Sequence, residues 1–226
     1  MHGGGGNTGP AEKQTGYYRV LGYRWVTLIF LFLLIFLNGV NMSFYAPIVV
    51  NMSFAYGVSI AMMQVFFVIV LLLYPITSFT IFKFVAEAHG PFACIIAGTI
   101  CVMTGSFMRC MLNSSFYPFM IIGFVFTGMS QPFLNNLAAI TSINWFPAKE
   151  RPLATMLASL GNTIGSTIGS VLPDLFLGGS YPFHFKVYRA NIIELFPYVI
   201  MSFFCITFYR EKPPFAPAYN IYLEQE

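Results

Sequence analysis

The sequence predicts an all-α integral membrane protein with six transmembrane helices, and two observations support this fold class. First, the 226-residue chain is 57% hydrophobic and 18% aromatic but only 8% charged, whereas soluble domains carry about 25% charged residues. Second, the apolar residues fall in runs of about 20 residues, the length that a helix needs to cross the hydrocarbon core. A soluble domain of this size could not bury so much apolar surface, so we expect a lipid bilayer around the chain.

Six stretches have the length and the apolar character of a membrane span. They run over residues 25–50, 59–82, 92–111, 116–140, 153–176 and 192–208. The Gly-rich, polar residues 1–22 read as a flexible cytoplasmic tail. We therefore expect a helical bundle over residues 23–209 and a second cytoplasmic tail over residues 210–226.

Lysines and arginines are distributed unevenly between the two sides of these spans. Eight lie on one side, namely Lys13, Arg19, Arg24, Lys83, Lys149, Arg151, Arg210 and Lys212, and three lie on the other, namely Arg109, Lys186 and Arg189. The richer side is expected to be cytoplasmic, and an even number of spans then places both termini there. The net charge of +3 is spread along the chain, so nucleic-acid binding is not expected.

The ionisable residues near the spans are predicted to lie at helix ends. Arg109 falls near the outer end of the third stretch, where its guanidinium can reach the membrane surface. Asp174 and Glu194 also fall at the ends of predicted spans. We therefore expect no acid or base in the middle of a helix.

Polar side chains inside the spans are predicted to face the bundle or a cavity, because they are costly in lipid. Asn38, Asn41 and Tyr45 follow one helical face of the first stretch, and Gln131 and Asn135 are one turn apart in the fourth. These groups suit a neutral or cationic organic ligand. Alternatively, the amides only join helices to one another.

The fifth stretch contains three glycines at intervals of four residues, Gly161, Gly165 and Gly169. Small residues at this spacing allow another helix to approach closely. The partner helix lies either inside this chain or outside it.

Two charged segments connect the spans on the side that is rich in lysine and arginine. One contains Glu87, His89 and Gly90, and the other contains Lys149 and Arg151. Neither segment holds a nucleophile elbow, a phosphate loop or paired carboxylates, and the four cysteines form no CxxC or Cys/His cluster. We expect no enzyme activity, no cofactor and no metal site.

Together these features resemble the amino-terminal half of a major facilitator superfamily transporter, which has two six-helix halves. The hallmark of that superfamily is a charged loop between helices two and three. Glu87 matches its acid, His89 a basic position and Gly90 its glycine, although the closing arginines are absent. The resemblance implies that Glu87 forms a cytoplasmic gate network with Lys149 and Arg151.

Several segments resemble the feline leukaemia virus subgroup C receptor-related family more closely. They are NWFPAKERPLATMLASLGNTIGSTIGSVLP at 144–173, FYREKPPFAPA at 208–218, AYGVS at 55–59 and the Arg109–Cys110 pair. Members of that family move choline and ethanolamine, haem, or a vitamin of the pyridoxine type. The resemblance covers about residues 23–218, which is nearly the whole chain.

The resemblance implies a carrier that moves a small organic solute by alternating access. Met42 matches a tryptophan that stacks on the substrate in choline-type members, and Thr163 matches a glutamine of helix five. With the polar residues described above, the predicted substrate-binding set is Asn41, Met42, Tyr45, Gln131, Asn135 and Thr163. Asn41, Gln131 and Asn135 are expected to supply hydrogen bonds, and Tyr45 an aromatic face.

The resemblance also implies a second six-helix half as a partner, because the family would enter the loop before helix seven near Glu226. That half is either the remainder of a longer carrier or another chain, and the glycine stripe of the fifth stretch would pack against it. The alternative is a structural or accessory membrane subunit without transport activity. The resemblance implies a location in the plasma membrane, with an organelle membrane as the alternative.

Overall fold

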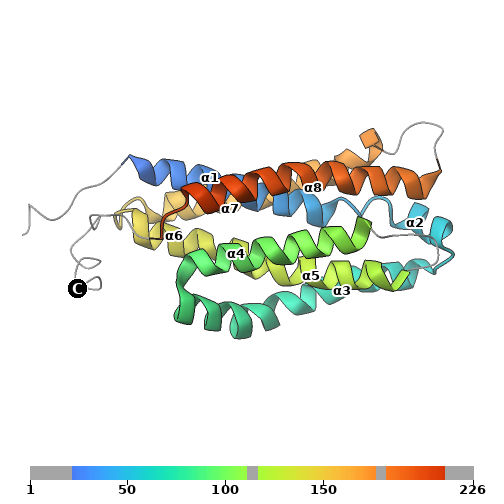
Figure 1. Ribbon diagram of the computed structural model, residues 1–226, viewed down its shortest axis with the longest axis horizontal. Coiled ribbons are helices and arrows are strands. Elements are labelled where there is room, and N and C mark those ends of the chain that lie inside the picture. Colours follow the sequence, from blue (N-terminus) through green and yellow to red (C-terminus); the bar gives the residue numbers. More distant parts are fainter. Residues whose placement is uncertain (1–21, 111–116, 177–181, 212–226) are drawn as a thin grey trace, which may run out of the picture.

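The computed structural model describes residues 22–110, 117–176 and 182–211, and every regular element in these ranges is helical. The elements are α1 (Tyr23–Ser43), α2 (Val49–Tyr56), α3 (Ile60–Thr77), the π-helix η1 (Ser78–Phe82), α4 (Lys83–Cys110), α5 (Tyr117–Asn135), α6 (Leu137–Trp145), α7 (Arg151–Phe176) and α8 (Phe183–Phe208). The long helices lie side by side along one axis and form an elongated bundle (Figure 1).

The first predicted span is shorter than expected, because α1 ends at Ser43 and the separate helix α2 begins at Val49. Pro47 lies between them; it lacks a backbone N–H and disfavours helical backbone in the residue before it. Tyr45 therefore lies beyond the end of α1. The prediction that it continues the Asn38–Asn41 face of one helix is wrong.

The second predicted span continues well past its expected end. Pro75 interrupts the hydrogen-bonding pattern of α3, the π-helix η1 follows, and α4 continues the helix as far as Gly90. Proline and π-bulges commonly bend a helix in this way. Gly90 has φ 80° and ψ 177°, a backbone conformation outside the helical region. The chain reverses there, so α3 and the rest of α4 run in opposite directions (Figure 1).

The fourth and sixth predicted spans are also extended. The fourth is divided into α5 and α6 at Asn136 and reaches Trp145. Helix α8 begins at Phe183, which places Glu194 in the middle of the helix. The prediction that Glu194 lies at a helix end is therefore wrong.

The glycine stripe of α7 packs against α1. A Cβ atom built on Gly161, Gly165 or Gly169 would lie 2.7, 2.0 and 2.5 Å from the carbonyl oxygens of Phe32, Phe36 and Val40 respectively. Only glycine permits this backbone-to-backbone approach. The alternative of a partner helix inside the chain is correct, and the expectation that the stripe faces a second half is wrong.

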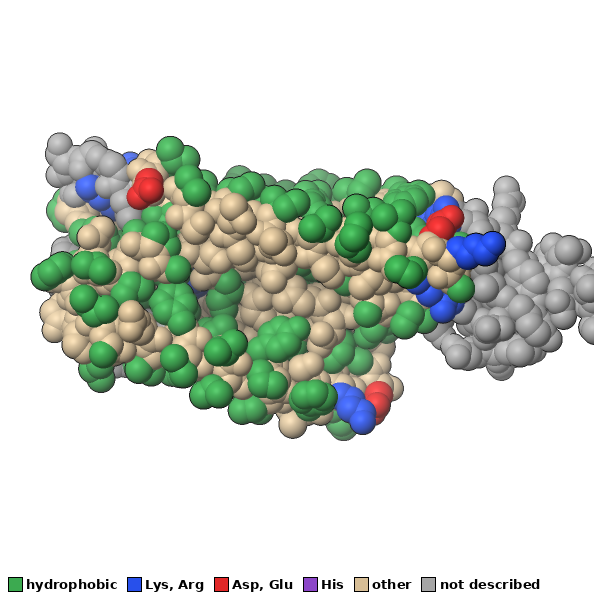
Figure 2. Space-filling model, turned by 180° about the vertical axis from the view of Figure 1, so that it is seen from behind, with side chains coloured by type: hydrophobic (Ala, Val, Ile, Leu, Met, Phe, Trp, Pro, Cys, Tyr) green, Lys and Arg blue, Asp and Glu red, His purple; other side chains and the backbone are tan. Residues whose placement is uncertain are grey.

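The surface of the bundle suits lipid. Three segments of the described chain are long and apolar enough to cross a membrane, namely Tyr23–Ser43, Ile60–Cys110 and Phe185–Phe208. Figure 2 shows charged side chains gathered near the two ends of one face, with hydrophobic side chains and backbone between them. That the chain crosses the membrane six times remains a prediction.

Candidate solute cavity

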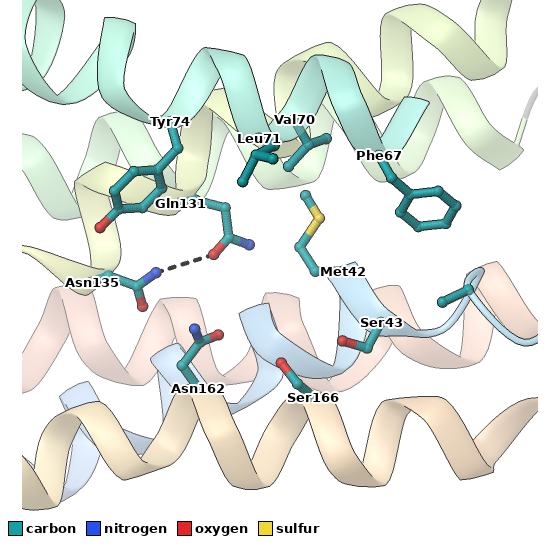
Figure 3. Close-up of a pocket in the computed structure, with 11 residues that line it drawn as sticks. Met42, Ser43, Phe67, Val70, Leu71, Tyr74, Gln131, Asn135, Asn162 and Ser166 are labelled. Atoms are coloured by element: carbon teal, nitrogen blue, oxygen red, sulfur yellow. Dashed lines mark hydrogen bonds between the residues drawn. The ribbon is translucent and has the colours of Figure 1, made fainter. Parts of the chain in front are cut away.

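A cavity of about 450 Å³ lies between α1, α3, α5 and α7. Its polar lining consists of Ser43, Tyr74, Gln131, Asn135, Asn162 and Ser166, and its apolar lining consists of Met42, Ala46, Phe67, Val70 and Leu71. Figure 3 shows these side chains converging from facing helices. The cavity is partly open, and its lining mixes amides, hydroxyls and apolar groups, as small-molecule sites do.

Gln131 and Asn135 form the hydrogen-bonding centre of the cavity. The Nδ2 of Asn135 donates to the Oε1 of Gln131 at 3.1 Å (Figure 3). The Nε2 of Gln131 is buried and has no hydrogen-bond partner in the described part of the chain. Since an unpaired buried donor costs about 1–3 kcal/mol, a hydrogen bond from this amide would be stabilising.

The structure brings together half of the predicted substrate-binding residues. Met42, Gln131 and Asn135 line the cavity, whereas Asn41, Tyr45 and Thr163 are not part of its lining. Asn41 and Tyr45 are buried elsewhere in the bundle. Thr163 is exposed on α7.

Asn162 and Ser166 are cavity residues that the sequence reasoning missed. Each follows a glycine of the α7 stripe by one residue, so both lie beside the α1–α7 contact and face the cavity (Figure 3). Asn162 and Ser166 are four residues apart and each follows a stripe glycine, a spacing that indicates two polar side chains on one face of the helix. Tyr74 was a visible polar residue of the second span, but nothing in its sequence context distinguished it from a lipid-facing tyrosine.

The bundle interior also contains ionisable groups, in contrast to the sequence-based expectation. Arg109 is fully buried, and its Nη2 donates to the Oδ1 of Asn41 at 2.5 Å and to the Oγ of Ser106 at 3.1 Å. The Nδ2 of Asn41 in turn donates to the Oε2 of Glu194 at 3.4 Å. The prediction that Arg109 extends to the membrane surface is wrong, because hydrogen bonds inside the bundle hold its guanidinium.

The predicted gate residues are not joined to one another in this structure. Glu87 pairs with Lys83 at 3.9 Å, and both side chains are exposed. Lys149 is exposed, and the Nε of Arg151 donates to the carbonyl oxygen of Phe146 at 3.1 Å. The gate network of Glu87, Lys149 and Arg151 stays a prediction.

A different carboxylate holds the turn at Gly90. The Oε1 of Glu211 accepts from the backbone N–H of Phe92 at 2.9 Å. It lies so close to Gly90 that a Cβ there would be 2.8 Å from it. The exposed His89 precedes this turn. Glu211 lies three residues beyond the end of α8. Nothing in the sequence indicated that it would contact the turn at Gly90.

Comparison with known proteins places this chain in a family of transporters. The sequence profile of the Major Facilitator Superfamily matches residues 31–221, and the chain therefore belongs to that superfamily. It is an all-helical, multi-pass membrane protein of a class that carries solutes across membranes.

Two relatives illustrate the similarity. The chain is 27% identical over 166 residues to the solute carrier family 49 member 4 homolog of Xenopus laevis, a match that covers 68% of this chain and 35% of the relative. Its fold is similar to the crystal structure of a bacterial homolog to the human lysosomal transporter Spinster, in an inward-facing and unoccupied conformation. That similarity has a TM-score of 0.63 and 19% identity and covers 88% of this chain. The chain spans 35% and 45% of the lengths of these two proteins.

Proposed function

We propose that this chain forms one half of a carrier that moves a small organic solute by alternating access. The superfamily match supports membrane transport, and the cavity between α1, α3, α5 and α7 supplies one wall of a binding site. Facilitators of this type place the substrate between two halves that rock against each other. The open part of the cavity is where the second half would lie.

The observation that carries the proposal is the unpaired amide nitrogen of Gln131. A polar group that merely joined helices would find its partner within the protein. Gln131 instead lines the cavity, accepts a bond from Asn135 and keeps its buried Nε2 without a hydrogen-bond partner among the described residues. This arrangement favours a binding role for the two amides over a purely structural one.

The lining favours a neutral or cationic solute. None of the residues that line the cavity carries a charge, so the cavity offers no cation to pair with the carboxylates of haem. Hydroxyl and amine groups can bond the amides, and an ammonium can lie against Tyr74 or Phe67. Among the solutes of the feline leukaemia virus subgroup C receptor-related family, we therefore propose choline, ethanolamine or a pyridoxine-type vitamin rather than haem.

The proposed orientation places both termini in the cytoplasm. Because Arg109 is buried among helices, it no longer counts as an outer loop charge. Lys186 and Arg189 remain on the outer side against eight lysines and arginines on the inner side. With two outer charges instead of three, the positive-inside rule supports a cytoplasmic amino terminus more strongly. The plasma membrane remains the proposed location.

Binding can be tested on the purified chain in lipid nanodiscs. Thermal unfolding is followed by tryptophan fluorescence, with choline, ethanolamine, pyridoxine and haemin added in separate titrations. We expect choline, ethanolamine or pyridoxine to raise the unfolding midpoint in a saturable way, since a ligand that binds only the folded state stabilises it. Removing one uncharged hydrogen bond in Gln131→Ala should weaken the apparent affinity about 2- to 10-fold.

Gln64→Ala is the matched control, because Gln64 is an exposed amide of α3 outside the cavity. Its titration should coincide with that of the unaltered chain. Stabilisation by haemin alone would overturn the proposed solute class. The absence of stabilisation by any of the four would favour the alternative, a membrane subunit without a solute site.

A further inference from the structure

Asn136, at the junction of α5 and α6, uses its side chain outside its own helix. An asparagine that begins a helix usually caps it through its side-chain oxygen. Asn136 has helical backbone angles, φ −70° and ψ −21°, and makes no such cap bond within the described residues. Its Nδ2 instead donates to the Oγ of Ser78 at 2.9 Å, and its Oδ1 accepts from the hydroxyl of Tyr74 at 3.4 Å. The side chain therefore joins two helices.

Both partners of Asn136 lie at the irregular part of α3. Tyr74 immediately precedes Pro75, and Ser78 is the first residue of the π-helix η1. Helices α3 and α5 also approach closely one turn earlier, where a Cβ on Gly128 would lie 3.3 Å from the Cα of Val70. The two helices are thus held together one turn before Tyr74 and one turn after it. This packing fixes the position of the Tyr74 side chain.

The bond to Asn136 determines what the Tyr74 hydroxyl can offer a solute. Tyr74 lines the solute cavity, whereas Asn136 does not. A phenol hydroxyl has one proton to donate and an oxygen that can accept. Because the proton is donated to Asn136, only the oxygen remains for a bound molecule. A solute beside Tyr74 must therefore supply the hydrogen of any hydrogen bond between them.

The neighbouring amide extends this preference. Asn135 donates its Nδ2 to Gln131 at 3.1 Å, which leaves its Oδ1 to accept from a solute. Figure 3 shows Tyr74, Gln131 and Asn135 next to one another at one end of the cavity. Two acceptors, the Tyr74 hydroxyl and the Asn135 carbonyl, thus lie at this end. An ammonium with N–H groups can donate to them, whereas a quaternary ammonium has no N–H to donate.

These acceptors decide between two kinds of amine. The N–H groups of a primary ammonium give up hydrogen bonds to water on entering a cavity, and this loss is costly unless the site replaces them. A quaternary ammonium loses no such bonds and can lie against the ring of Tyr74 or Phe67. Aromatic faces alone would therefore favour the quaternary amine. Fixed acceptors reverse that preference.

We propose that Asn136 is a positioning residue that sets the specificity of the cavity. By holding the proton of the Tyr74 hydroxyl, it makes the cavity select solutes that carry N–H donors, so that primary amines are preferred over quaternary amines. This selection rests on the carrier function proposed above, whereas the bond between Asn136 and Tyr74 does not. The bond and the selection are therefore tested separately.

The first experiment tests the bond without any solute. Thermal unfolding in lipid nanodiscs is measured for Tyr74→Phe, Asn136→Leu and the double variant. Since both changes remove the same hydrogen bond, we expect the double variant to lose less stability than the sum of the two single losses. Gln64→Leu, which alters an exposed amide of α3, is the control and should be additive with Tyr74→Phe. Additive losses for Tyr74→Phe and Asn136→Leu overturn the proposal.

The second experiment measures the affinities for ethanolamine and choline, and its readout is their ratio. In the unaltered chain ethanolamine should bind about 10-fold more tightly than choline. The preference should fall severalfold in Asn136→Leu and vanish in Tyr74→Phe, which keeps the ring but lacks the oxygen. Asn136→Asp should retain it, because a carboxyl oxygen still accepts from Tyr74. Loosened packing alone would weaken both affinities equally and leave the ratio unchanged.

Three results in the second experiment overturn the proposal. They are equal or tighter binding of choline by the unaltered chain, a ratio that Asn136→Leu leaves unchanged, and the absence of binding of either amine. In the last case a pyridoxine titration separates the two proposals. Saturable binding of pyridoxine would leave the carrier function standing and overturn only the amine selection, whereas the absence of all binding would contradict both.

Discussion

Replacing Gly165 by alanine tests the close contact between α1 and α7. The added Cβ would lie 2.0 Å from the carbonyl oxygen of Phe36, which is 1.4 Å short of the 3.4 Å where ordinary contact begins. The obstacle is backbone, which cannot rotate aside, so the two helices must separate locally. Overpacking of this kind costs about 1–3 kcal/mol. The gain in helix propensity offsets about 1 kcal/mol of that.

Gly161 provides a graded comparison on the same stripe. There the Cβ would lie 2.7 Å from the carbonyl oxygen of Phe32, a shortfall of only half as much. We expect both alanine variants to be destabilised, that at Gly161 less than that at Gly165. Gly22→Ala is the matched control, since it adds the same methyl group where no atom lies within 4 Å.

The assay is thermal unfolding in a mild detergent, followed by tryptophan fluorescence. Trp25 and Trp145 lie on α1 and α6. A loss of 1 kcal/mol lowers the midpoint by roughly 2–4 °C for a chain of this size. We expect the midpoints to fall in the order control, Gly161→Ala, Gly165→Ala. A Gly165→Ala chain as stable as the control would refute the contact between the two helices.

The remaining predictions concern the turn after the second span and the buried thiols. Gly90→Ala should lower the free energy of unfolding by about 1–3 kcal/mol, because the backbone conformation of Gly90 is reserved for glycine. Thermal unfolding should show the same loss in a double variant with Glu211→Ala, in which the Glu211 side chain no longer lies beside the added methyl group. Glu211→Ala alone should lower the midpoint because it leaves a backbone N–H unpaired; the exposed Glu87→Ala should not. A bulky maleimide should leave the fully buried Cys94 and Cys205 unmodified in the native chain; their labelling at the rate of the denatured chain would contradict the packing around them.

The fold class followed from composition and the lengths of the apolar runs, and the superfamily match agrees with it. The errors occurred at helix ends, where a hydropathy pattern carries little information. Apolar residues before and after Pro47 hid the end of α1, and polar residues before position 192 hid the first turns of α8. The extended α8 then changed Glu194 from a residue at a helix end to one in the bundle interior.

The candidate site was predictable to the extent that amides one turn apart share a face. Gln131 and Asn135 satisfied that rule and line the cavity. Asn41 satisfied it too, but its side chain is bound to Arg109. The sequence could not reveal this, because the partner is 68 residues away on another helix. Long-range pairing, rather than local pattern, decides whether a polar residue binds a solute or joins helices.

The most direct test of the account is solute uptake by the protein in a native membrane. Cells that produce it are given radiolabelled choline, ethanolamine or pyridoxine, and uptake is compared among the unaltered protein, Gln131→Ala with Asn135→Ala, and the control Gln64→Ala. The account predicts saturable uptake of one of these solutes, lost in the double variant and retained in the control. Saturable uptake that the double variant leaves unchanged would contradict the assignment of this cavity as the solute site.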